Sequence, residues 1–289
     1  MLIGRFAPSP TGYMHLGNAR TALLAWLQMR ALHGKVILRI EDLDQNRCRA
    51  FAYDAIRRDL EWLGLDWDQE YLQSERLDYY QQALDALETY PCSCSRKDIQ
   101  NAVSAPHDQH GQESIYPGTC RQQGANQSKP LAIRWKTPDQ TIDVHDLRMG
   151  KQSQQIKIEQ GDIVLKRNDG CFAYHLAVVV DDALMGITHI LRGEDLWAST
   201  PIQVALQTAL SYSQPTYLHA PLMRDYQGQR LAKRHGAPSV HDLRQAGQKP
   251  EKILADLASS LGWAVPSEVG RHELLQLYGS PLAEGKLQI

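Results

Sequence analysis

The sequence predicts an α/β fold in which helices pack on a mostly parallel sheet. Residues 1–40 alternate between a short apolar strand, a loop, an amphipathic helix and a second apolar strand, which is the order of a βαβ unit. Regular α/β patterning returns after residue 173. Between these two regions lies a polar stretch that holds three of the five cysteines, which predicts an insertion.

The first unit is predicted from residue type and spacing. Residues 2–6 are short and apolar, and Pro8, Pro10 and Gly12 then exclude regular structure. Apolar residues recur at helical spacing over 17–33, and Gly34 is a typical helix stop. Residues 36–40 form an apolar run of the buried-strand type.

The later elements follow in order along the chain. We expect helices over 51–63 and 75–89, no sustained period over 90–129, short strands over 133–165, α/β structure from 174–180, a strand over 188–191 and a helix over 199–210. Past Ala237 the pattern is helical. The expected division is 1–90 and 173–236 as two halves of one domain, 91–172 as an insertion, and 237–289 as a short helical part.

Composition predicts a soluble protein with a sizeable core. Of 289 residues 43% are hydrophobic, and the net charge of −2 argues against a general nucleic-acid coat. No apolar run approaches the roughly 18 residues that span a bilayer, and the N-terminus lacks the pattern of a signal peptide. We therefore expect no membrane partner, a cytoplasmic location and a monomer.

Two segments have the chemistry of a nucleotide site. The first, residues 8–18, joins the first strand to the first helix, where free backbone N–H groups suit phosphate. Gly12 and Gly17 allow close backbone approach, and His15 can donate a hydrogen bond to a phosphate oxygen. The second segment, residues 228–234, is a glycine followed by closely spaced cations.

The cysteines predict a metal site. An odd number of cysteines without an export signal argues against a disulfide framework. Cys92, Cys94 and Cys120 would supply three thiolates of a closed tetrahedral zinc site in an otherwise unsupported polar loop. On chemical grounds His107 and His110 compete for the fourth position.

Four blocks resemble the class I glutamyl-tRNA synthetases. They are a HIGH-type signature in Arg5-Phe6-Ala7-Pro8-Ser9-Pro10-Thr11-Gly12 with His15-Leu16-Gly17-Asn18, a strand end in Arg39-Ile40-Glu41-Asp42-Leu43-Asp44, the block Leu191-Arg192-Gly193-Glu194-Asp195-Leu196, and a KMSKS-type loop in Arg230-Leu231-Ala232-Lys233-Arg234. The resemblance implies a Rossmann-type catalytic domain that uses ATP with Mg²⁺. It assigns ATP contacts to His15, Gly17, Asn18 and Lys233, with His15 and Lys233 as catalytic residues.

The resemblance also implies a pocket for L-glutamate. It places the amino acid against residues from three blocks and one further tyrosine: Arg5, Phe6, Ala7, Pro8, Ser9, Glu41, Tyr174 and Arg192. A dicarboxylic amino acid needs two cations and one anion. Arg5, Glu41 and Arg192 each end a predicted strand, and ligands of open parallel sheets bind beyond such ends. Our hypothesis is that Glu41 holds the ammonium group and the arginines divide the carboxylates.

The short build resembles the glutamyl-queuosine tRNA(Asp) synthetases, which lack the domain that reads the anticodon in full-length relatives. That resemblance implies Tyr116 as the fourth ligand of a structural Zn²⁺ with Cys92, Cys94 and Cys120. It also implies tRNA-independent activation of glutamate and its transfer to queuosine in the anticodon stem-loop of tRNA(Asp). Two alternatives stay open: a truncated glutamyl-tRNA synthetase that charges a tRNA 3′ end, and a non-catalytic zinc-containing tRNA-binding paralogue. The presence of His15, Glu41, Arg192 and Lys233 together disfavours the paralogue.

Overall fold

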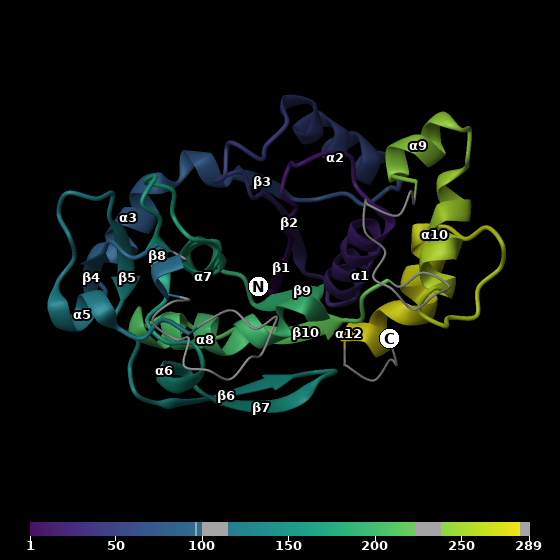
Figure 1. The fold of residues 1–289 in the computed structure, drawn as a ribbon. Coiled ribbons are helices and arrows are strands. Elements are labelled where there is room, and N and C mark those ends of the chain that lie inside the picture. Colours follow the sequence, from purple (N-terminus) through teal and green to yellow (C-terminus); the bar gives the residue numbers. More distant parts are fainter. Residues whose placement is uncertain (96, 100–114, 224–237, 284–289) are drawn as a thin grey trace.

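The computed structural model describes residues 1–95, 97–99, 115–223 and 238–283, and these contain two sheets (Figure 1). The larger is seven-stranded, in the order β3-β2-β1-β9-β10-β6-β7. The smaller has three antiparallel strands in the order β4-β5-β8. The strands are β1 (Ile3–Phe6), β2 (Lys35–Ile40), β3 (Gln69–Leu72), β4 (Thr89–Cys92), β5 (Ala132–Trp135), β6 (Thr141–Asp146), β7 (Gly150–Gln155), β8 (Val164–Lys166), β9 (His189–Gly193) and β10 (Thr216–Ala220).

Helices cover the large sheet and extend to the C-terminal part (Figure 1). They are α1 (Leu16–Ala31), α2 (Ala50–Trp62), α3 (Leu77–Asp85), α5 (Thr119–Gln123), α6 (Ile156–Glu159), α7 (Tyr174–Leu184), α8 (Thr200–Ala209), α9 (Val240–Gln245), α10 (Pro250–Ser259), α11 (Arg271–Leu274) and α12 (Ser280–Ala283), with 3₁₀ turns η1 (Gln73–Glu75) and η2 (Glu194–Ser199) and a π turn η4 (Leu275–Gly279).

The predicted βαβ unit is confirmed. β1 and β2 pair in parallel with α1 as their crossover. Successive strand residues face opposite sides, so Leu38 and Ile40 pack with α1 in one core while Ile37 belongs to the other. The first core also includes α10 and the second includes α7 and α8. The sheet is therefore covered on both faces, as parallel sheets require.

The topology brings distant segments together at the centre of the sheet. β1 lies between β2 and β9, and Ile3 donates its backbone N–H to Oγ1 of Thr188, 185 positions away, over 2.9 Å. β9 pairs in parallel with β10, and β10 with β6. All pairs of the large sheet are parallel except β6 with β7. The carboxyl ends of β1, β2 and β9 consequently open on one edge.

Strands of the predicted insertion, 91–172, belong to both sheets. Strands β6 and β7 lie within it but extend the large sheet, while β4, β5 and β8 make the small one. The reason lies in β6, where alternate residues Ile142, Val144 and Asp146 are buried, and two of them belong to the core that includes α8. The proposed domain boundaries stay predictions.

Two further differences concern the ends of elements. The helix expected over 75–89 ends at Asp85, because Thr89 already begins β4 and pairs with Trp135. Residues 174–180 are helical and belong to α7.

Among the helices of the described residues, none combines the length and the apolar character that a membrane crossing would need.

Candidate functional site

A cavity of about 520 Å³ opens at the carboxyl ends of β1, β2 and β9. Its lining includes the sequence-predicted residues Arg5, Phe6, Ala7, Pro8, Ser9, His15, Gly17, Asn18, Glu41, Tyr174 and Arg192. Lys233 and the other residues of the second predicted segment lie outside the described residues. The structure thus brings residues from three of the four predicted blocks, together with Tyr174, to one cavity.

Buried charges of alternating sign hold Arg5 and Glu41 in that cavity. Nε of Arg5 donates to Oδ1 of Asp182 over 3.2 Å, and the same oxygen accepts from Nη1 of Arg39 over 2.6 Å. Nη2 of Arg39 then donates to Oε1 of Glu41 over 3.2 Å. Arg39 is fully buried, and Asp182 is nearly so. Sequence reasoning missed the role of Asp182, whose partner Arg5 is 177 positions away.

The charges also shift proton affinities. Burial raises the pKa of Glu41, although Arg39 and Arg5 oppose that shift. Burial acts in the same direction on Asp182, but Arg39 and Arg5 overcome it, so the pKa of Asp182 is lowered. The buried arginines therefore compensate Asp182 fully and Glu41 only in part, so a cation bound beside Glu41 would further stabilise its charged form.

Arg192 reaches the cavity from β9 and is 4% exposed. Its Nε donates to Nε2 of His219 over 3.0 Å, and its Nη2 donates to Oγ1 of Thr200 over 2.9 Å. Nη1 is buried without a hydrogen-bond partner in the described residues. A buried guanidinium N–H without a partner is costly, so Nη1 of Arg192 could still donate to a polar partner.

Tyr174 and His175 begin α7 at the same cavity edge. Tyr174 lines the cavity and is 36% exposed, so it is accessible to a ligand rather than part of the core. Burial lowers the pKa of His175 to about 4, with Arg192 acting in the same direction. His175 is therefore neutral at physiological pH and adds no cation to the site.

The N-terminus of α1 forms the other wall. His15 is its N-cap residue, and Nδ1 of His15 accepts the backbone N–H of Asn18 over 3.2 Å. A Cβ atom at position 17 would lie 3.1 Å from that Nδ1, so glycine suits the close turn. Backbone N–H groups at a helix N-terminus favour phosphate, and Gly17 and Asn18 line the cavity here.

Described residues that flank 224–237 lie beside the first predicted nucleotide segment and its cavity. Met223 lines the cavity, and Ser239 forms a β-bridge with His15. The ring of His241 stacks on Tyr13 at 4.0 Å between centroids. Ser239 and His241, which follow residues 224–237 in the sequence, therefore lie against the first segment, and Met223, which precedes them, lies at the cavity.

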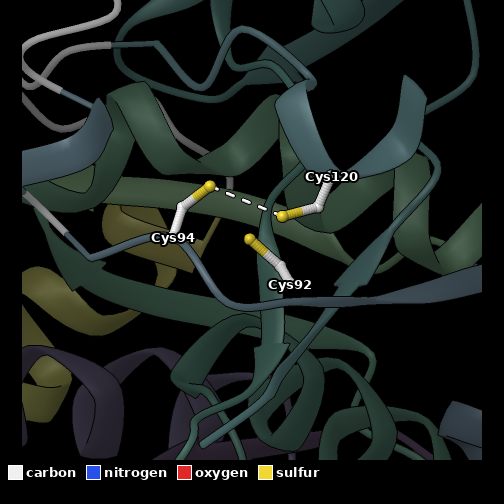
Figure 2. A group of neighbouring side chains, drawn as sticks. All are labelled: Cys92, Cys94 and Cys120. Atoms are coloured by element: carbon white, nitrogen blue, oxygen red, sulfur yellow. Dashed lines mark hydrogen bonds between the residues drawn. The ribbon is translucent and has the colours of Figure 1, made fainter. Parts of the chain in front are cut away.

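The three cysteines form a compact cluster beside the small sheet (Figure 2). Their sulfur atoms lie within 4.8 Å of one another and point inward. Oη of Tyr116 lies 3.5 Å from Sγ of Cys92 and 3.8 Å from Sγ of Cys94. Ligand–ligand edges of about 3.8 Å follow from a Zn–S bond of about 2.3 Å in a tetrahedron, so these donors fit such a metal. His107 and His110 lie outside the described residues.

Comparison with known proteins defines the class. The family "tRNA synthetases class I (E and Q), catalytic domain" matches residues 1–280, so the chain is a ligase of the class I aminoacyl-tRNA synthetase type. It is 56% identical to the glutamyl-Q tRNA(Asp) synthetase of Deinococcus radiodurans, with 97% of each chain covered. The enzyme of that name from Symbiobacterium thermophilum is 44% identical, with 96% of this chain and 92% of the relative covered. The chain belongs to the glutamyl-Q tRNA(Asp) synthetase family.

Solved structures agree with this assignment. The glutamate-tRNA synthetase of Elizabethkingia anophelis superposes with a TM-score of 0.80 at 28% identity. The match covers 95% of this chain and 65% of that structure. The α/β fold with a mostly parallel sheet is therefore that of glutamyl-tRNA synthetases.

Proposed function

We propose that this chain activates L-glutamate with ATP, without tRNA, and transfers the glutamyl group to queuosine in the anticodon of tRNA(Asp). The name of the Deinococcus relative supports the acceptor. The observation that carries glutamate activation is the convergence of Arg5, Glu41 and Arg192 on one cavity. Two guanidiniums and one carboxylate match the charges of a dicarboxylic amino acid.

The proposed first step is in-line displacement. A carboxylate oxygen of glutamate attacks the α-phosphorus of ATP, the bond to the leaving oxygen breaks, and pyrophosphate departs with Mg²⁺. The protein positions the reactants and stabilises developing charge, so no nucleophilic side chain is needed. In this proposal the N-terminus of α1, His15 and Lys233 hold the triphosphate, and Glu41 holds the ammonium group. In the second step a nucleophile on queuosine attacks the adenylate carbonyl and AMP leaves.

Pyrophosphate exchange tests the activation step. The purified chain is incubated with ATP, Mg²⁺ and labelled pyrophosphate, with glutamate and without tRNA. We expect label to enter ATP only when glutamate is present, and aspartate or glutamine to replace it poorly. An absence of exchange until tRNA is added would contradict tRNA-independent activation, and an absence in every mixture would favour the non-catalytic paralogue.

Removal of the tRNA 3′ end tests the acceptor. Labelled glutamate is transferred to tRNA(Asp) with or without queuosine, and the terminal adenosine is then cleaved off. We expect label only on the queuosine-containing tRNA, and we expect it to stay with the body of the tRNA after cleavage. Label that departs with the adenosine would instead identify a truncated glutamyl-tRNA synthetase.

We also propose that Cys92, Cys94, Cys120 and Tyr116 hold a structural Zn²⁺. The support is the fit of their spacing to a tetrahedral site in which all four positions are protein ligands. Metal analysis of the purified chain tests the identity of the ion. The expected monomeric state and cytoplasmic location are tested by light scattering and by cell fractionation.

A further inference from the structure

Arg192 is the end of a buried chain of hydrogen bonds that crosses three strands. His219 on β10 is the direct neighbour of Arg192 in the parallel register of β9 and β10. Its Nε2 accepts from Nε of Arg192, and its Nδ1 lies 2.7 Å from Oδ2 of Asp146 at the end of β6. His219 and Asp146 are both fully buried. Neither His219 nor Asp146 lines the cavity, so neither would contact a ligand bound there.

The two hydrogen bonds of the His219 ring fix its tautomer. A guanidinium only donates, so Nε2 of His219 must be the unprotonated nitrogen. Nδ1 then carries the proton and donates it to the carboxylate of Asp146. Burial lowers the pKa of His219 against the opposing hydrogen bond to Asp146, which keeps the ring neutral.

Two nitrogens of Arg192 are thereby immobilised, and the third has no hydrogen-bond partner in the described residues. Thr200 holds Nη2 while its own hydroxyl donates to the carbonyl of Leu196. Nη1 is buried and has no partner in the described part of the chain. The hydrogen bonds of Arg192 to His219 and Thr200 therefore fix the plane of its guanidinium group at the cavity.

We propose that Asp146 and His219 are positioning residues that fix the plane of the Arg192 guanidinium group at the cavity, where this group meets a carboxylate of the amino-acid substrate. The proposal rests on the proposed function, because it takes glutamate as the occupant of the cavity. Neither residue touches the reacting atoms. Their contribution is to the affinity for the amino acid and not to the binding of ATP.

Asp146→Asn is the sharpest test because the neighbouring backbone N–H groups fix the orientation of an asparagine side chain at this position. Oδ1 of Asp146 accepts the backbone N–H groups of Arg148 and Met149 over 2.9 and 2.7 Å. An asparagine must keep its oxygen on those donors, so its NH₂ group faces Nδ1 of His219. To accept a hydrogen bond from this NH₂ group, Nδ1 of His219 must lose its proton, which moves to Nε2. The new N–H at Nε2 then faces the Nε–H of Arg192, so two donors meet without an acceptor. The variant thus reverses the tautomer while it preserves the shape of the side chain.

The experiment is glutamate-dependent pyrophosphate exchange with the full chain. For Asp146→Asn we expect the KM for glutamate to rise about 10- to 100-fold, since a buried donor of Arg192 loses its acceptor. The KM for ATP should stay within about twofold, and the melting temperature should show a folded protein. His219→Gln offers an acceptor at the position of Nε2, so we expect it to recover most of the affinity that His219→Leu loses.

Asp143→Asn is the matched control, because Asp143 lies on the same strand and is exposed. We expect its KM for glutamate to be unchanged. The proposal is overturned if Asp146→Asn and His219→Leu both keep the KM for glutamate, or if they raise the KM values for glutamate and ATP equally. These outcomes differ from failure of the proposed function, in which the unaltered chain itself shows no exchange with glutamate.

Discussion

At the scale of single residues, buried ions that neutralise one another hold Arg5 and Glu41 at the cavity. Arg39 has no exposed surface and contacts Asp182, Glu41 and, over 3.8 Å, Asp181. Removing one partner of such a buried pair leaves the other uncompensated and is strongly destabilising. Substitutions of Arg39, Asp181 or Asp182 should therefore affect folding, whereas those of cavity-lining residues should affect binding.

Glu41→Gln tests the predicted ammonium contact. The substitution keeps the volume and an acceptor but removes the negative charge, and Arg39 retains its two aspartates. We expect the KM for glutamate to rise about 10- to 100-fold, as for loss of a charge-assisted hydrogen bond, with a smaller effect on the KM for ATP. Pyrophosphate exchange measures both, and an unchanged KM for glutamate would remove Glu41 from the pocket.

Arg192→Ala and Arg192→Lys test the predicted carboxylate contact. Alanine removes all three nitrogens, so we expect glutamate-dependent exchange to fall by at least about 100-fold in a folded protein. Lysine restores the charge but cannot reach His219, Thr200 and a ligand at once, so we expect it to recover little. Near-normal exchange by the alanine variant would contradict the assignment, and circular dichroism checks that the fold survives.

At the scale of elements, α9 is held on α2 beside the nucleotide segment. Nη2 of Arg244 on α9 lies 3.4 Å from Oδ1 of Asp59 on α2. Asp59 is fully buried, and neither of its oxygens has a hydrogen-bond partner in the described residues. Burial raises the pKa of Asp59 to about 6, against the opposing effect of Arg244. At neutral pH the carboxyl group of Asp59 is therefore a buried anion beside Arg244.

Asp59→Asn should change how stability depends on pH. Because the pKa of Asp59 is higher in the folded chain than in the unfolded one, the folded form binds more protons between about pH 4 and 6, and stability falls as pH rises through that window. Asparagine removes this slope. We expect the free energy of unfolding of the variant, relative to the unaltered chain, to gain about 1 kcal/mol between pH 5 and 7.5.

Urea titrations at several pH values measure that change. Glu61→Gln is the control, because Glu61 is exposed on the same helix and should leave the slope unaltered. A parallel pH dependence of Asp59→Asn and the unaltered chain would show that the Asp59 carboxyl titrates normally.

Local elements were predictable from the sequence, but their partners were not. Pro8, Pro10 and the helical spacing after Gly17 predict the first unit, because each acts on its own neighbourhood. The alternation of β6 equally predicts a strand, yet nothing in it identifies β10 as the partner. The same limit applies to the site. Arg5, Glu41 and Arg192 stand in recognisable blocks, whereas Asp146 meets His219 only through a contact over 73 positions.

At the scale of the whole molecule, the cysteine cluster stands apart from the two main cores. Tyr90, Cys92, Tyr116 and Cys120 form a small core of their own. Asp162 ties this region to the small sheet, since it accepts from the hydroxyl of Tyr90 and from the backbone N–H of Thr137. The region therefore has support that does not depend on a metal.

If the proposed zinc is bound, its removal should consequently loosen one region and spare the rest. With a strong chelator or in Cys120→Ser, we expect loss of about one zinc per chain and faster amide hydrogen exchange around 90–95 and 115–123. Glutamate-dependent pyrophosphate exchange should stay within about threefold. Cys48→Ser is the control for loss of a thiol outside the cluster, and equal zinc content in the two variants would contradict the assigned ligands.

The central place of β1 has a consequence for synthesis on the ribosome. The edge of β1 that faces β9 is covered only after Thr188 has been synthesised, 185 positions after Ile3. At about 5–20 residues per second, that edge stays open for roughly 10–40 s while the nascent chain grows. An uncovered strand edge invites pairing with other chains. Cells that translate this protein slowly should therefore depend more on chaperones that hold its emerging N-terminal half.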